Sequence, residues 1–127
     1  MLSEFVKTAD FKSEKHVPVI DCAETVKAGE PFTVTVSVGK EIPHPNTPVH
    51  HIDWIALHFV PAGSKLSTEV GRCTFSAHQT DPATPFQIQS APTVTLTVAV
   101  NKPGTFYATS YCNLHGLWAS EKSITVA

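Results

Sequence analysis

Apolar and polar residues alternate along much of the chain, a pattern typical of strands with one buried face. In "FTVTVSV" (32–38) every second residue is apolar, and threonine or serine fills the positions between. "TVTLTVAV" (93–100) repeats this period of two. Successive side chains of an extended strand point to opposite faces, so both segments are predicted to be strands. No window of helical length shows a clean period of 3.6 residues.

Turn-forming residues separate these two segments from five further strand candidates. The candidates are residues 16–21, 50–60, 69–77, 104–111 and 122–127. Segments such as "KAGEP", "IPHPNTP" and "NKPG" lie between them and hold many of the ten prolines and six glycines. About seven short strands joined by such turns predict an all-β fold, an immunoglobulin-like antiparallel β-sandwich.

Length and charge narrow the class of protein. A chain of 127 residues suits one domain, and we expect a single domain over residues 1–127 with an N-terminal arm of residues 1–15. The net charge of −2 gives no basic surface for nucleic acid. No apolar run is long enough to span a membrane. The charged N-terminal segment lacks the apolar run of a signal peptide, so we expect a cytoplasmic location.

The three cysteines, Cys22, Cys73 and Cys112, do not suggest a disulfide framework. Their number is odd, and no secretion signal accompanies them. Cys73 alternates with Phe75 and Ala77 on an apolar strand face, so we expect a thiol in the core. Cys22 follows a short strand, and we expect it to be structural.

Imidazole, thiol and charged groups gather in three segments at predicted loops or strand ends, where functional residues are often displayed. These segments are "SEKHVP", "HPNTPVHH" and "YCNLHG". Their chemistry-bearing residues are Glu14, Lys15, His16, His44, His50, Cys112 and His115. Two other histidines, His58 and His78, belong to no such motif and are predicted not to bind metal.

The pair Cys112 and His115 allows several kinds of chemistry. A thioredoxin-like redox pair needs a second cysteine where His115 stands. A cysteine nucleophile could use His115 as its base, but the remaining histidines of the three segments would have no role. A metal site uses all of them, because thiolate and imidazole are ligands for zinc, copper and iron.

The number and type of ligands separate the candidate metals. A closed structural zinc site usually takes four ligands, fewer than the four histidines and one cysteine available here. A cupredoxin-like copper protein for electron transfer is the alternative function, but its usual axial methionine is missing, since Met1 is the only methionine. Four imidazoles and one thiolate fit a square-pyramidal iron with an open sixth position.

Three quoted segments resemble the iron site of the superoxide reductases, the neelaredoxin and desulfoferrodoxin group. They are "EKHVPVI", "HPNTPVHHIDWI" and "YCNLHGLW", and the resemblance runs from about Glu14 to the C-terminus. It implies a seven-stranded immunoglobulin-like sandwich and one non-haem iron per chain. It also implies four equatorial imidazole ligands and an axial thiolate from Cys112. The implied imidazole ligands are His16, His44, His50 and His115, and His51 is not among them.

The same resemblance implies the reaction. Superoxide would be reduced by one electron to hydrogen peroxide, with a rubredoxin-like carrier as the external donor, in defence against oxidative stress. Glu14 would be a mobile carboxylate that can occupy the sixth position of ferric iron, and Lys15 would lie near the open position. No second iron site with four cysteines precedes His16. The chain therefore resembles the one-iron, neelaredoxin-like class, whose members are often homotetramers.

Overall fold

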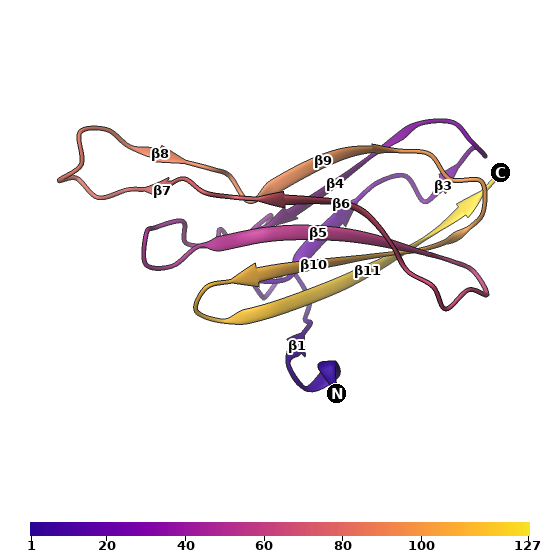
Figure 1. Ribbon diagram of the computed structural model, residues 1–127, viewed down its shortest axis with the longest axis horizontal. Coiled ribbons are helices and arrows are strands. Elements are labelled where there is room, and N and C mark those ends of the chain that lie inside the picture. Colours follow the sequence, from indigo (N-terminus) through magenta and orange to yellow (C-terminus); the bar gives the residue numbers. More distant parts are fainter.

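The computed structural model covers residues 1–127, and its regular secondary structure is almost entirely β, in two facing sheets and one small hairpin (Figure 1). The larger sheet has the order β1-β11-β10-β5-β6, and β3 pairs with β11 beside this path. The smaller sheet has the order β2-β4-β9, and β7 pairs with β8 alone. The strands are β1 (Val6–Lys7), β2 (Pro18–Asp21), β3 (Thr25–Val26), β4 (Phe32–Val38), β5 (Ile52–Pro61), β6 (Thr68–Thr74), β7 (His78–Gln79), β8 (Ile88–Gln89), β9 (Thr93–Val98), β10 (Gly104–Cys112) and β11 (Gly116–Val126).

Alternating side chains from the two sheets fill the space between them. Val34 and Val36 of β4 have no exposed surface, and neither do Ile55 and Leu57 of β5 or Phe106 of β10. Burial of each such side chain contributes about 1.5–3 kcal/mol. Seven of the eleven strands have four residues or more, so the predicted β-sandwich of about seven strands is confirmed.

Strand β11 is longer than the sequence pattern indicated. It begins at Gly116 rather than near residue 122, and it pairs with the whole of β10, from Cys112 opposite Gly116 to Gly104 opposite Ile124. Glu121 and Lys122 interrupt its apolar alternation. Strands β1, β3, β7 and β8 have two residues each, which is too few to show a period.

Strand pairing brings two loops to one end of the sandwich. Strand β10 lies between β5 and β11, so the loop that leads into β5 and the turn between β10 and β11 are neighbours (Figure 1). The register of β5 and β10 shifts between Tyr111 and Cys112. Such an irregularity bends a strand and changes the direction of its side chains. The register shift lies directly before Cys112, whose sulfur belongs to the predicted metal site.

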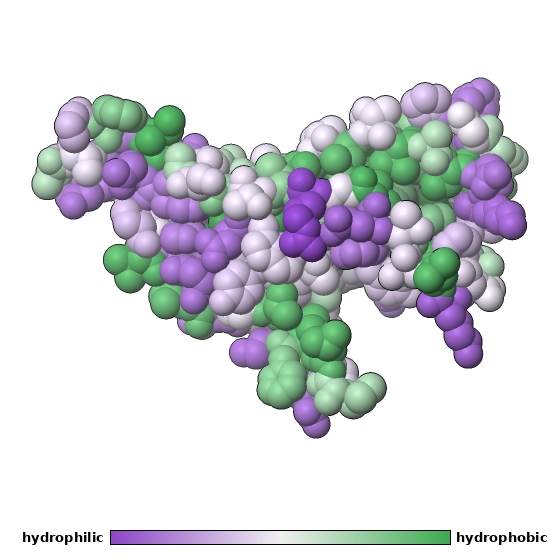
Figure 2. Space-filling view, in the orientation of Figure 1, coloured by the Kyte–Doolittle hydropathy of each residue, from purple (hydrophilic) through white to green (hydrophobic).

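The first residues of the chain project from the sandwich. Met1, Leu2 and Phe5 are largely exposed, and Figure 2 shows this projection as mostly apolar. The only helical element is a single 3-10 turn, Leu2–Glu4. No helix of the protein has the length and apolar character needed to cross a membrane. Further along, Val6 and Lys7 pair in parallel with β11.

Gly39 makes the tight turn after β4 possible. Its φ is +84°, and a Cβ atom at this position would lie 2.7 Å from the backbone nitrogen of His44. The chain therefore folds back on itself closely just before the second predicted ligand segment. Gly63 has a similar φ of +81°, but a Cβ there would meet nothing within 4 Å.

This pair of glycines gives a matched test of how the His44 segment is held. Gly63→Ala should lower the free energy of unfolding by about 1–2 kcal/mol, the cost of a left-handed backbone with a Cβ. Gly39→Ala should lower it by clearly more, because the added methyl group also overlaps the His44 backbone. Urea unfolding of both variants measures the difference. Equal losses would mean that the close approach to His44 does not constrain the loop.

Candidate metal centre

Four histidine rings form a square at the end of the sandwich where the two loops meet. Neighbouring ring centroids are 4.7 Å apart for His16–His44, His44–His50 and His16–His115, and 4.9 Å apart for His50–His115. The planes of neighbouring rings are inclined by 61–77°. Across the square, the centroids of His16 and His50 are 6.1 Å apart. The structure thus brings together all four predicted imidazole ligands, although they come from three distant segments.

Ring nitrogens face one another inside this square. His115 Nδ1 lies 3.1 Å from His16 Nε2 and 3.2 Å from His50 Nε2. A metal ion bound at about 2.1 Å to each nitrogen would hold neighbouring nitrogens about 3 Å apart. One proton on His115 Nδ1 can serve only one of the two facing nitrogens, so the arrangement suits a shared cation better than a hydrogen-bond network.

Partners outside the square leave the inner nitrogens of two histidines free to bind metal. His44 Nδ1 donates to the Pro45 carbonyl at 2.6 Å, and its Nε2 is buried without any hydrogen-bond partner. His16 Nδ1 lies 2.6 Å from Glu14 Oε1. A metal-binding histidine commonly donates its other ring N–H to a carbonyl or a carboxylate in this way.

The Cys112 sulfur lies beside the square and is fully buried. Its Sγ is 3.7 Å from His115 Nδ1. The donor atoms of His16, His50, Cys112 and His115 all lie within 4.8 Å of one another. His44 falls outside this distance limit, but its orphaned Nε2 and its two neighbouring rings assign it to the same group. The residues therefore fit a metal held by imidazoles and one thiolate.

Burial favours the neutral form of two imidazoles of the square, His44 and His50. Desolvation is the main cause that lowers the pKa of His44 to about 4, and it also lowers the pKa of His50. Repulsion by the Lys15 ammonium is a smaller contribution to both shifts, so Lys15 lies close enough to act on the centre electrostatically. The pKa of Glu14 is lowered, chiefly by its hydrogen bond with His16. Neutral imidazole is the form that binds metal.

Two contacts from β10 and β11 support His16. The His16 ring stacks on Trp118 with centroids 5.0 Å apart and planes inclined by 14°. Ser110, which has no exposed surface, donates its hydroxyl to the His16 carbonyl at 3.2 Å. Ser110 and Trp118 face each other across β10 and β11. An isolated serine at an apolar strand position is a weak signal of such a contact.

A second group of possible ligands, His51, Asp53 and His78, lies beside the square. The rings of His51 and His78 are stacked, 3.7 Å apart and nearly parallel. Parallel stacked rings direct their nitrogen lone pairs along parallel lines, which does not suit one shared ion. Each of their four nitrogens lies within hydrogen-bonding distance of an oxygen, and the N–H of each neutral ring therefore has a partner in either tautomer; the four oxygens are Thr47 O, Asp53 Oδ1, Asn46 Oδ1 and Phe75 O. We therefore regard this group as a support for the ligand loop.

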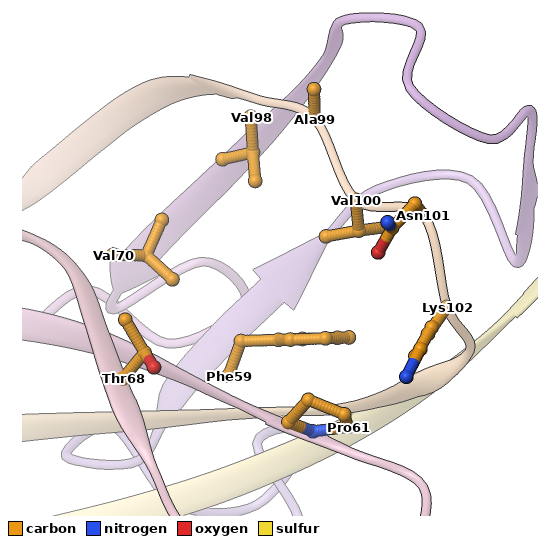
Figure 3. Close-up of a pocket in the computed structure, with 9 residues that line it drawn as sticks. All are labelled: Phe59, Pro61, Thr68, Val70, Val98, Ala99, Val100, Asn101 and Lys102. Atoms are coloured by element: carbon orange, nitrogen blue, oxygen red, sulfur yellow. The ribbon is translucent and has the colours of Figure 1, made fainter.

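The largest hollow of the protein is shown in Figure 3, and it lies at the Pro61 end of β5, away from the histidine square. It has a volume of about 360 Å³ and lies between β5, β6 and the segment that follows β9. Apolar side chains line most of it, and Lys102 is its one charged residue. Its lining includes no histidine, cysteine or carboxylate that could bind a metal. The histidine square is the better candidate for the functional site.

Comparisons with known proteins agree with this assignment. The family model described as Desulfoferrodoxin matches residues 8–121. The neelaredoxin of Megalodesulfovibrio gigas is 46% identical over 127 residues, which cover 98% of both chains. The superoxide reductase of Pyrococcus horikoshii is 49% identical over 121 residues, which cover 95% of this chain and 96% of that protein.

Solved structures show the same fold. A crystal structure of a superoxide reductase candidate from Thermotoga maritima superimposes with a TM-score of 0.94 at 52% identity, covering 100% of this chain and 98% of the other. The superoxide reductase (neelaredoxin) from Archaeoglobus fulgidus in the reduced form gives a TM-score of 0.86 at 44% identity. That match covers 96% of this chain and 99% of the other.

The lowered pKa of His44 predicts a pH dependence of the metal-free protein. The folded state has a pKa of about 4 and the unfolded state has the ordinary value of 6.5, so between these values the unfolded state binds more protons. The free energy of unfolding should therefore fall as pH drops from about 6.5 towards 4, by up to about 3 kcal/mol at 1.4 kcal/mol per unit. Urea midpoints across this range measure the loss.

Substitution of single histidines identifies the residue responsible. His44→Gln should flatten the pH profile of the urea midpoint, because the buried group that resists protonation is gone. His58→Gln changes a half-exposed histidine far from the square and should leave the slope as it is. An unchanged slope in His44→Gln would contradict the assignment.

Proposed function

The chain belongs to the desulfoferrodoxin family, and from this membership we propose that it is a superoxide reductase with one non-haem iron. The reaction takes up one electron and two protons and converts superoxide to hydrogen peroxide. The observation that carries the proposal is the square of four imidazoles beside a buried thiol. A zinc site would need fewer ligands, and a cupredoxin-like copper site would contain fewer histidines.

We propose that five residues bind the iron. His16, His44 and His50 would bind through Nε2, and His115 would bind through Nδ1, because these atoms face the interior of the square or have no other partner. Cys112 would bind through Sγ. When bound, the iron supplies a centre that transfers single electrons and attracts a small anion.

The remaining steps depend on the chain itself. The Cys112 sulfur is shielded from water, so as a thiolate it keeps its electron density for the metal. The ring of Trp118 covers one face of His16 and restricts its rotation. The His115 ring is exposed, which gives solvent and small anions access to the edge of the site.

Glu14 has a defined place in this structure. Its Oε1 accepts hydrogen bonds from the His16 ring at 2.6 Å and from the His16 backbone at 3.1 Å, which fixes the ring with Nε2 directed inward. The family resemblance further predicts that the carboxylate can reach ferric iron. That movement would break both hydrogen bonds to His16. We therefore propose two alternating roles for Glu14, as a partner of His16 and as a carboxylate that displaces the product.

Lys15 is the positive charge that follows Glu14 directly. It is half-buried, and its charge acts on both His44 and His50. No carboxylate forms an ion pair with it in this structure. An unneutralised ammonium group next to the centre suits the attraction of superoxide and the ordering of water that delivers protons.

Two features of the proposed function, the electron donor and the homotetrameric assembly, rest on the family resemblance. An external one-electron donor, rubredoxin-like in size and chemistry, must restore ferrous iron after each turnover. The assembly would be a homotetramer, and the enzyme would act in the cytoplasm.

The thiolate ligand provides the direct test of the proposed function. The native protein should contain about one iron per chain, show a visible thiolate-to-iron absorption band when oxidised, and reduce superoxide without release of dioxygen. Cys112→Ser should remove the band and most of the activity, because only this sulfur adjoins the square. Metal analysis, absorption spectra and pulse-radiolysis rates measure the three properties.

Cys73→Ser is the matched control. Cys73 is on β6, and its only hydrogen-bond contact is with Thr74 of its own strand. The band and the rate should survive this change. A native protein that contains copper or zinc, or a Cys73→Ser variant that loses the colour while Cys112→Ser keeps it, would overturn the assignment.

The charge of Lys15 predicts a salt dependence. The chain has a net charge of −2, so only a local positive region can attract an anion. Lys15→Ala should lower the second-order rate with superoxide several-fold at low salt and should flatten its decline as salt is added, because the Debye length shrinks from about 30 Å at 0.01 M to about 10 Å at 0.1 M. Stopped-flow or pulse-radiolysis rates over a salt series measure both effects.

Lys102→Ala removes the same charge from the other end of β10. The nine residues of this strand separate the two positions by about 30 Å. This control should leave the rate and its salt dependence close to those of the unchanged protein. If the two lysine variants behave alike, Lys15 has no specific part in attracting the substrate.

A further inference from the structure

Asn113 connects the two loops that carry four of the five proposed ligands, His44 and His50 before β5 and Cys112 and His115 at the turn between β10 and β11. Its side-chain Oδ1 accepts a hydrogen bond from the His51 N–H at 2.8 Å. Its side-chain Nδ2 donates to the Val49 carbonyl, also at 2.8 Å. Its own backbone N–H donates to the His51 carbonyl at 3.2 Å. All three bonds join the turn between β10 and β11 to the loop before β5.

These bonds enclose His50 on both sides. Val49 and His51 are its neighbours in sequence, and each gives a backbone group to the Asn113 amide. A carboxamide has one acceptor and one donor side, as a peptide unit has, so it can continue a strand ladder where backbone pairing ends. The regular pairing of β5 with β10 ends at Ile52 and Cys112, so Asn113 takes over directly after the last pair.

Asn113 also adjoins the proposed thiolate ligand. It follows Cys112 directly and precedes His115 by two residues, so its position is tied to both ligands of the turn. All three of its hydrogen bonds hold the His50 segment. The amide is the only side chain that hydrogen-bonds to both flanks of His50 and belongs to the turn itself.

We propose that Asn113 is a positioning residue that sets the Cys112 sulfur and the His50 nitrogen at the separation the metal requires. This inference rests on the proposed metal site and extends it to a residue that binds neither metal nor substrate. Hydrogen-bonded groups around metal ligands commonly change metal affinity by 10- to 100-fold when they are removed. Asn113 controls two ligand loops at once, so its effect should lie in this range.

Variants at position 113 distinguish the contribution of the amide oxygen, which accepts from His51, from that of the amide nitrogen, which donates to Val49. Asn113→Ala removes both side-chain hydrogen bonds and should speed iron release to a chelator by about 10-fold or more. It should also broaden or shift the visible thiolate-to-iron band and change the midpoint potential, because the sulfur and the imidazole are no longer held in register. Asn113→Asp keeps the acceptor for the His51 N–H but loses the donor to Val49. Its rate of iron release should fall between those of the alanine variant and the native protein.

Amide hydrogen exchange tests the contact without relying on redox chemistry. In the zinc-loaded protein, the His51 N–H should exchange faster in Asn113→Ala than in the native protein, and Asn113→Asp should retain most of the protection. Release of zinc should accelerate in the same order as release of iron. These zinc measurements do not depend on superoxide reduction, so they would hold even if the proposed enzymatic function were wrong.

Thr35→Ala is the control for a general loss of stability. Its hydroxyl forms a cross-strand hydrogen bond with Thr95 at 2.9 Å in the smaller sheet and does not contact the metal site. This variant should keep the native rate of metal release, band position and His51 exchange. The proposal is wrong if Asn113→Ala releases iron within twofold of the native rate with an unshifted band. It is also wrong if Thr35→Ala disturbs these properties as much as Asn113→Ala does.

Discussion

The antiparallel pairing of β5, β10 and β11 is the constraint on which the centre depends. Strand β10 contacts its two neighbours along its whole length, and this fixes where the His44–His50 loop and the Cys112–His115 turn end. His50 and His115 are more than sixty residues apart in sequence, and they meet because the register of β5, β10 and β11 brings the ends of these strands together. The His16 segment joins them through Ser110, a buried hydroxyl on the middle strand.

The four histidines of the square lower the free energy of unfolding of the metal-free protein. His44 Nε2 is buried without a partner, and a buried polar atom left in this state costs about 1–3 kcal/mol. The nitrogens of His16, His50 and His115 converge although they cannot all be satisfied by protons. Burial of apolar side chains between the two sheets offsets this cost. A cation bound to these nitrogens would remove the unfavourable interactions among them and would also add favourable metal–ligand bonds.

The sequence predicted the all-β sandwich well, because alternation is strong in β4 and β9, where threonine and apolar residues follow a strict period. It also indicated the segments of the square, since paired imidazole and thiol groups stood out in turns. It did not reveal Asn113, whose importance lies in contacts with Val49 and His51 across the strand pair. Nor did it reveal the stacking of His51 on His78, because no spacing rule links residues in two separate loops. The role of Glu14 as a hydrogen-bond partner of His16 likewise depends on backbone geometry and not on residue type.

The complete burial of Cys112 has a consequence for the durability of the protein. Hydrogen peroxide, the proposed product, oxidises thiolates to sulfenic and higher acids, and exposed low-pKa sulfurs react first. The one sulfur proposed to be a thiolate has no exposed surface, and burial raises the pKa of Cys22, which keeps that thiol protonated and unreactive. The same packing that places the Cys112 sulfur beside the metal would thus shield this ligand from the proposed product and limit its oxidation during repeated turnover.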